Sequence, residues 1–150
     1  MSLSSMTDGA ETAVALQKYS AFVDEVLRPQ LQQTLERRDA IAREATEYAE
    51  LRELLSELLS RKDSSQPLHT LMDVGERFRV RAKVVDTTMI TVDVGLNFHV
   101  EMTLSEAMTF VTSHLQYLTE KRSVWQQKAR EVSEHVNLVL DAIQKLAELQ

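Results

Sequence analysis

The side chains of this sequence that could bind a metal or transfer a proton are four histidines and a repeated pair of aspartates. The histidines are scattered over predicted strand, loop and helix without the spacing of metal ligands; they are His69, His99, His114 and His135. The sequence has no cysteine, and it shows no nucleophile paired with a base, no glycine-rich phosphate loop and no HExxH motif. We therefore expect no catalytic residue, no metal ion and no cofactor, and a protein that is not an enzyme.

The two aspartates belong to a phrase that the chain repeats. Its copies are Met72-Asp-Val-Gly-Glu-Arg-Phe-Arg-Val80 and Val92-Asp-Val-Gly-Leu-Asn-Phe-His-Val100. Polar and apolar residues alternate on both sides of each Asp-Val-Gly, which is typical of half-buried strands. Glycine permits the positive φ that a tight turn requires. The phrase therefore predicts two β-hairpins, at about residues 70–84 and 89–102, joined at Val85-Asp-Thr-Thr88.

Each predicted hairpin has an apolar face that needs a cover. An isolated hairpin is marginal in water, and its unpaired edges invite further strands. The long helices on either side are expected to use their apolar stripes on each other, so other subunits must cover the hairpins. The residues expected to form this oligomerisation surface are Phe78, Val80, Ala82, Val84, Ile90, Val92, Val94, Phe98, Val100 and Met102.

Two helical segments enclose the hairpins, at about residues 11–62 and 104–150. Alternate steps of four and three residues from Leu104 to Leu146 meet an apolar residue every time except at Arg122, which is the heptad period of a coiled coil. Thr103 and Glu106 have the spacing of a capping box at the start of this helix. The expected fold is mainly α with small β: a long antiparallel coiled-coil hairpin with two central β-hairpins.

Composition and one proline predict where the helical segments begin and end. Residues 1–10 are small and polar and are expected to be disordered, residues 63–69 to be a linker, and residues 11–150 to form one domain. Pro29 costs about 3 kcal/mol in a helix interior, so the preceding segment is either a kinked continuation or a separate short helix. The expected pairing of the seams puts Tyr48 opposite Leu118, a register that can slip by a heptad.

The charge of the chain limits the classes of partner. A net charge of −6, from 17 Lys and Arg against 23 Asp and Glu, argues against nucleic acid. No apolar run approaches the ~18 residues of a membrane span, and the first residues lack the basic and apolar regions of a signal peptide. We expect no direct nucleic-acid partner and no membrane. One strand face is nevertheless basic, either as a solvated face that discourages aggregation or as a docking surface for an acidic partner; its residues are Arg77, Arg79, Arg81 and Lys83.

The passage from the hairpins into the last helix resembles that of α-type prefoldin subunits. The residues that carry the resemblance are Val84-Val-Asp-Thr87, Ile90-Thr-Val-Asp-Val-Gly95 and Phe98-His-Val-Glu-Met-Thr-Leu-Ser-Glu-Ala107. In the first helix, the matches to one α-type prefoldin-like subunit of eukaryotes are Tyr19-Ser-Ala-Phe22, Val26-Leu27, Arg38-Asp39 and Glu47-Tyr-Ala-Glu-Leu-Arg52. The chain departs from the family at Val85, where proline is common, and at Pro29.

The resemblance implies a subunit of a hetero-oligomeric co-chaperone. In this family two α-type and four β-type subunits join their hairpins into a platform, and the coiled-coil tips hold non-native proteins without ATP. It implies as partners other prefoldin or prefoldin-like subunits and unfolded or assembling client proteins. It also implies a cytoplasmic and nuclear location and a part in transcription regulation. The alternative is a scaffold or transcription-cofactor adaptor that binds specific folded partners through the coiled coil.

The client-binding residues are expected where the two chain ends meet at the tip of the coiled coil. Frayed helix ends expose apolar groups to another chain. The expected residues are Val14, Tyr19, Phe22, Val23, Val136, Val139, Leu140, Ile143, Leu146 and Leu149. The competing interpretation is that they complete the coiled coil, although Leu140 and Leu149 lie off its main seam.

Overall fold

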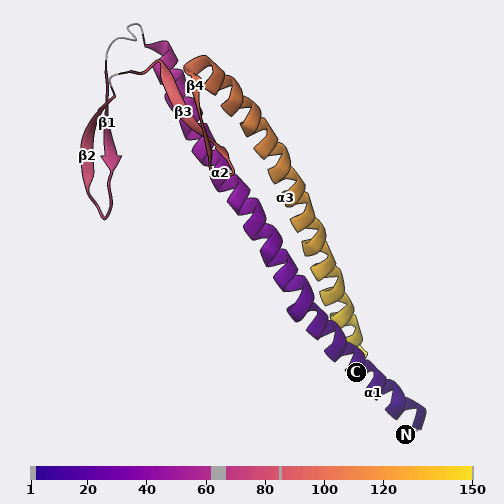
Figure 1. The fold of residues 1–150 in the computed structure, drawn as a ribbon. Helices are drawn as coiled ribbons and strands as arrows, with labels where there is room; N and C mark the ends of the chain where they lie inside the picture. Colours follow the sequence, from indigo (N-terminus) through magenta and orange to yellow (C-terminus); the bar gives the residue numbers. More distant parts are fainter. Residues whose placement is uncertain (1–2, 62–66, 85, 150) are drawn as a thin grey trace. The chain divides into compact units, whose positions relative to one another are not determined.

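The computed structural model describes residues 3–61, 67–84 and 86–149, which are mainly helical with two small antiparallel hairpins (Figure 1). The predicted fold class is therefore confirmed. In chain order the elements are α1 Leu3–Phe22, the π-helix η1 Val23–Leu27, α2 Arg28–Ser60, β1 Leu68–Asp73, β2 Arg79–Val84, β3 Met89–Gly95, β4 Phe98–Thr103 and α3 Leu104–Glu148.

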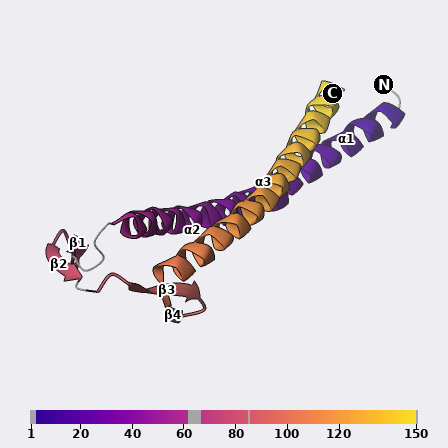
Figure 2. The same ribbon diagram turned by 90° about the horizontal axis from the view of Figure 1, so that it is seen from above.

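The chain divides into two compact units. The first contains residues 1–43 and 119–150, and the second contains residues 44–118. In the first unit, α1, η1 and the start of α2 run antiparallel to the second half of α3, so that the start of α1 and the end of α3 lie at the same end of the unit (Figures 1 and 2). The second unit holds the end of α2, both hairpins and the start of α3.

The seam predicted along α3 is confirmed by burial. Between Leu104 and Leu146 every seam residue is buried or half-buried except Arg122, which is exposed. The buried seam residues are Val111, Leu118, Ala129 and Val136. The register of the pairing differs from the predicted one. The ring of Tyr48 lies 4.4 Å from that of His114, one helical turn before Leu118, and edge-on to that of Phe110, two turns before it.

Pro29 neither ends the first helix nor separates a short one from it. The N–H of Arg28 donates to the carbonyl oxygen of Val23, five residues back, within the π-helix η1. Helical structure therefore continues from α1 through Pro29 into α2, with one wider turn before the proline. This arrangement accommodates a residue that lacks an N–H and whose ring crowds the carbonyl of the preceding turn.

Two predicted boundaries are wrong. Helix α1 begins at Leu3, whereas residues 1–10 were expected to be disordered. No proline interrupts this stretch, and the Thr12 hydroxyl donates to the carbonyl oxygen of Asp8 at 2.8 Å, so the helix runs on toward the N-terminus. Helix α2 ends at Ser60, and β1 begins at Leu68, inside the predicted linker. Of the rest of that linker, residues 63–66 lie outside the described residues, and Pro67 is described.

Both copies of the repeated phrase form hairpins with the same register. Met72 stands opposite Val80, and Val92 stands opposite Val100. The two glycines have φ values of 127° at Gly75 and 98° at Gly95, as the turns were predicted to require. The predicted hairpin ranges are confirmed. Of the predicted joint between them, Val85 lies outside the described residues.

The start of α3 fixes the second hairpin to the helix. The Thr103 hydroxyl accepts a hydrogen bond from the Glu106 N–H at 3.2 Å, and the Glu106 carboxylate accepts one from the Thr103 N–H at 3.4 Å. This is the predicted capping box. Since β4 ends at Thr103 and α3 begins at Leu104, no linker separates strand from helix.

Candidate functional site

The apolar face of the β1–β2 hairpin is exposed. The pairs Met72–Val80 and Thr70–Ala82 lie on this face, because directly opposite residues point to the same side. The Phe78 side chain next to the turn is 73% exposed. The exposed large apolar side chains of this hairpin are Leu71, Met72, Val74, Phe78, Val80 and Val84. Of the residues predicted for oligomerisation here, Ala82 alone is half-buried.

The β3–β4 hairpin, in contrast, is covered by the chain's own helices. Val92 is only 2% exposed and Met102 is buried, and both belong to a core with Leu55 of α2 and Ala107 and Val111 of α3. Ile90 and Val94 pack against the same core. The expectation that the helices leave nothing to cover this face is therefore wrong. The apolar faces of the helices are wider here than the heptad seams, because Leu51 and Ala107 add apolar surface beside the seams.

The oligomerisation residues thus fall into two groups. Phe98 and Val100 of β4 are exposed, like the face of the first hairpin. The group that the chain itself covers consists of Ile90, Val92, Val94 and Met102. The role of the exposed group in assembly stays a prediction.

Tyr48 joins helix α2 to the second hairpin. Its hydroxyl donates to the backbone carbonyl oxygen of Asp93 at 2.9 Å, and its ring packs edge-on to Phe110 and close to His114. Burial raises the pKa of the Tyr48 hydroxyl above its ordinary value near 10, and the nearby carboxylate of Glu44 adds to the effect. Sequence reasoning placed Tyr48 on the seam and missed this bond. The signal was a hydroxyl-bearing ring at a seam position of the first helix, since a buried tyrosine hydroxyl usually finds a hydrogen-bond partner.

Replacing Tyr48 by phenylalanine should lower the free energy of unfolding by about 1 kcal/mol, the usual net contribution of one hydrogen bond. Because folding raises the pKa of Tyr48, its contribution is fully present below pH ~10 and is lost as the pH rises through the raised pKa. The difference between the two proteins should therefore shrink above pH 10. Urea unfolding at several pH values measures it, with the exposed Tyr19→Phe as control; equal losses in both variants would contradict the expectation.

The residues predicted to bind clients divide between core and surface. Val23, which is 1% exposed, and Val136 form a buried cluster with Leu27, and Val139 and Ile143 pack against it. Leu146 is half-buried. The exposed members of the predicted set are Val14, Tyr19, Phe22, Leu140 and Leu149. The interpretation that these residues complete the coiled coil holds for the buried and half-buried group. The side chains of the exposed group are accessible to another protein.

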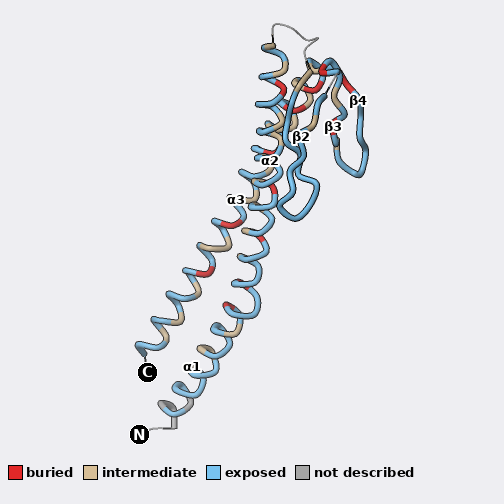
Figure 3. Tube along the Cα trace, turned by 90° about the vertical axis from the view of Figure 1, so that its left-hand side faces the viewer, coloured by how far each residue is buried: buried red, intermediate tan, exposed pale blue. Residues whose placement is uncertain are grey.

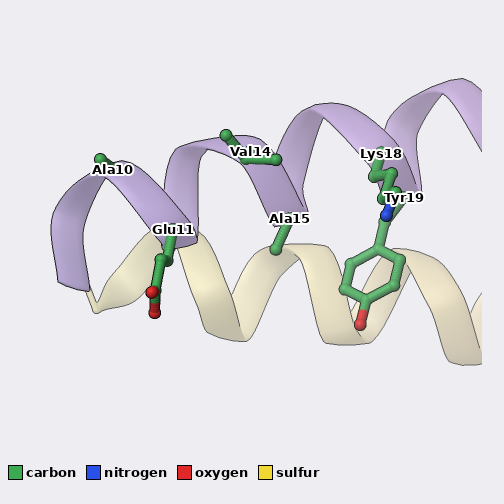
Figure 4. Close-up of a pocket in the computed structure, with 6 residues that line it drawn as sticks. All are labelled: Ala10, Glu11, Val14, Ala15, Lys18 and Tyr19. Atoms are coloured by element: carbon green, nitrogen blue, oxygen red, sulfur yellow. The ribbon is translucent and has the colours of Figure 1, made fainter. Parts of the chain in front are cut away.

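A shallow groove of about 460 Å³ runs along the exposed part of α1. Figure 4 shows its lining side chains on successive turns of the helix; they are Ala10, Glu11, Val14, Ala15, Lys18 and Tyr19. The small side chains of Ala10 and Ala15 leave the space, and Val14 and Tyr19 give it apolar walls. One acid and one base stand at its sides. Such a groove offers apolar contact without a fixed polar pattern.

The histidines do not meet. The Nε2 atom of His114 lies 3.5 Å from the Glu44 carboxylate, and the His135 ring lies edge-on to Phe22. His69 and His99 are exposed on separate strands. Among residues 3–61, 67–84 and 86–149, no three His, Asp or Glu side chains gather as a metal site would require. Within these same ranges no helix has the length and apolarity to cross a bilayer.

Similar proteins were found by sequence. A family model described as "Prefoldin subunit" matches residues 27–149. Protein UXT of Bos taurus is 31% identical over 139 residues, which cover 93% of this chain and 88% of that protein. Protein UXT of Homo sapiens is 30% identical, covering 89% and 83%, and the Protein UXT homolog of Nematostella vectensis is 31% identical, covering 87% and 82%.

A solved structure has the same fold. The chain of filamentous PFD from Methanocaldococcus jannaschii, determined by cryo-electron microscopy, matches with a TM-score of 0.61 at 18% identity. The match covers 80% of this chain and 97% of that one, and at this identity it shows the fold alone. The sequence matches, the doubled hairpin and the confirmed coiled-coil seam agree with one another, and they establish that this chain belongs to the prefoldin subunit family, as a UXT-like chaperone subunit.

Proposed function

We propose that the chain is a non-enzymatic subunit of a hetero-oligomeric prefoldin-like co-chaperone, which assembles through its hairpins and holds non-native or assembling clients with the ends of its helices. The observation that carries this proposal is the uncovered face of the β1–β2 hairpin. Its apolar side chains, with Phe78 foremost, are exposed on a sheet of two strands. Apolar side chains gathered on an unpaired sheet are the mark of a subunit interface.

Client holding is supported by exposed apolar residues near the two ends of the sequence. Val14 and Tyr19 line the groove on α1, and Leu140 and Leu149 are exposed on α3. Contacts of this kind give about 25 cal/mol per Å² of apolar surface, so that a few of them bind weakly and release without ATP. A cytoplasmic and nuclear location and a part in transcription regulation stay predictions that rest on the resemblance.

The test is purification of the tagged full chain from the cells that make it. We expect a complex far heavier than the 17.1 kDa chain, with other prefoldin-family subunits as its neighbours. The complex should suppress aggregation of unrelated, chemically unfolded proteins such as citrate synthase. A complex that binds only particular folded partners and protects no unfolded protein would favour the adaptor instead. A free 17.1 kDa monomer would contradict assembly altogether.

A further inference from the structure

The β1–β2 hairpin is basic within an acidic chain. Residues 68–84 contain four basic and two acidic residues, whereas the whole chain carries a net charge of −6. Arg79, Arg81 and Lys83 stand at alternate positions of β2 and therefore project from the face opposite the apolar one. All three are exposed, and Figure 3 shows β2 pale blue along nearly its whole length. We call these three residues the basic stripe.

The neighbouring strand neutralises only part of the basic stripe. The Asp73 carboxylate lies 3.3 Å from Nε of Arg79. Arg81 stands opposite Leu71, which carries no charge. Within the described part of the chain, no carboxylate forms an ion pair with Arg81 or Lys83. The stripe therefore keeps an excess of positive charge on the surface of the hairpin.

The strand that carries the stripe has a free edge. Among the described residues, β1 and β2 form a sheet of two strands, so β2 is paired on one side only. A strand added at the other side would place its side chains about 5 Å, between Cβ atoms, from the β2 side chains of the same face. It would meet Val80 and Ala82 on one face and the basic stripe on the other.

A second copy of β2 does not fit this edge. Any antiparallel register that keeps the apolar faces together places odd-numbered residues opposite odd-numbered ones, because side chains alternate. With Arg81 opposite its own copy, Arg79 stands opposite Lys83, and a shift of two residues again opposes cations. Like charges directly opposite each other are destabilising. The basic stripe thus disfavours pairing of the hairpin with itself.

The other strands of a second copy do not match the stripe either. Each carries a single carboxylate on its polar face: Asp73 in β1, Asp93 in β3 and Glu101 in β4. Asp73 already pairs with Arg79 in its own chain. A strand complementary to three alternate cations must therefore come from a different protein.

We propose that the free edge of β2 accepts a strand from a different subunit, in which apolar residues alternate with Asp or Glu. This inference rests on the proposed function, since it states the chemistry of the subunit that joins the first hairpin. Opposite charges on directly opposite residues stabilise a strand pair, and the apolar residues of the incoming strand cover Val80 and Ala82 at the same time. The basic stripe thereby disfavours a second copy of this chain and favours a strand with acidic side chains.

The test uses three fluorescent β-hairpin peptides, each closed by a disulfide and differing only in the outer strand, where Val alternates with Glu, Thr or Lys. Each is titrated with the full chain and followed by anisotropy. We expect the Glu peptide to bind about 10-fold more tightly than the Thr peptide, and the Lys peptide to bind most weakly. The preference should weaken as salt rises, because the charges are exposed.

Charge reversal provides the matched variant. Arg79→Glu, Arg81→Glu and Lys83→Glu together should invert the order of the three peptides, whereas Arg79→Lys with Arg81→Lys should preserve it. Circular dichroism checks that the helices are intact. Equal binding of the three peptides to the natural chain would overturn the inference. So would an order that survives charge reversal, or a dimer of the purified chain that charge reversal dissociates.

The outcomes separate this inference from the proposed function. If the chain prefers the Glu peptide but co-purifies with no other subunit, the inference is supported and the proposed function is contradicted. If the chain assembles with prefoldin-family subunits but does not prefer the Glu peptide, the proposed function is supported and the inference is contradicted.

Discussion

Replacing both Phe78 and Val80 by aspartate should release the chain from its complex without unfolding it. In the free chain both side chains are largely in water, so the substitutions remove little buried surface. In the proposed assembly the same positions are covered by another subunit, and burying an unpaired carboxylate there costs several kcal/mol. We expect the dissociation constant to rise by at least about 100-fold. Sedimentation of the purified complex, with circular dichroism of the free chain, measures both effects.

The matched control lies on the outer surface of α3. Val124 and Leu138 are 53% and 67% exposed, close to the exposures of Val80 and Phe78, and they are distant in sequence from the hairpins. Val124→Asp with Leu138→Asp should leave the mass of the complex unchanged. If the control releases the chain as readily as the hairpin variant does, loss of apolar surface in general, and not the β1–β2 face, explains the result.

The helices and strands were predictable because their signals are local and periodic. The heptad from Leu104 to Leu146 holds over the whole of α3, and the exception it predicts, Arg122, is the exposed seam residue. The Asp-Val-Gly phrase determined both turns because only a residue without Cβ adopts the φ of Gly75 easily. The register of the coiled coil was not predictable to one turn, because a heptad repeat specifies which residues face the partner helix but not which partner residue they meet.

The difference between the two hairpins was beyond the reach of the pattern. Both phrases alternate in the same way, and both predict an apolar face in need of a cover. In the structure the two hairpins differ in how they are connected to the helices. Strand β4 passes from Thr103 directly into Leu104 of α3, so the second hairpin is fixed to the helix that covers Val92. The first hairpin has no such junction, since residues between Ser60 and Leu68 separate it from α2. The direct junction with α3 holds the second hairpin against the helices whose apolar side chains cover it.

The client-binding prediction was incomplete for a related reason. An apolar residue near a helix end reads the same in the sequence whether it faces the partner helix or water. Val23 and Val136 lie in the buried cluster, whereas Leu149 is 79% exposed and lies off the seam, as its position outside the heptad indicated. The heptad therefore contained the signal that separates the two groups. The heptad showed that Leu140 and Leu149 lie off the seam. Because α1 lacks a regular heptad, the sequence could not show whether Val14 faces the partner helix or water.

Replacing four of the five exposed members of this set by serine should abolish protection of an unfolded client while assembly persists. Val14, Tyr19, Leu140 and Leu149 are exposed and belong to no buried cluster, so Val14→Ser, Tyr19→Ser, Leu140→Ser and Leu149→Ser together leave the packing of the helices intact. If they provide the apolar surface that a client covers, their loss removes most of a weak interaction, and protection should fall by at least about 10-fold in the concentration of complex required. Light scattering during aggregation of chemically unfolded citrate synthase measures it.

The buried residues of the same set supply the control. Val23→Ser and Val136→Ser should lower the free energy of unfolding by about 2 kcal/mol or more, because each buries a hydroxyl and leaves a cavity beside Leu27. The exposed variants should unfold at the same urea concentration as the natural chain. Undiminished protection by the exposed variants, with the complex intact, would place client binding elsewhere on the assembly. Loss of one specific folded partner, with protection of unfolded proteins unchanged, would instead identify this end of the chain as an adaptor surface.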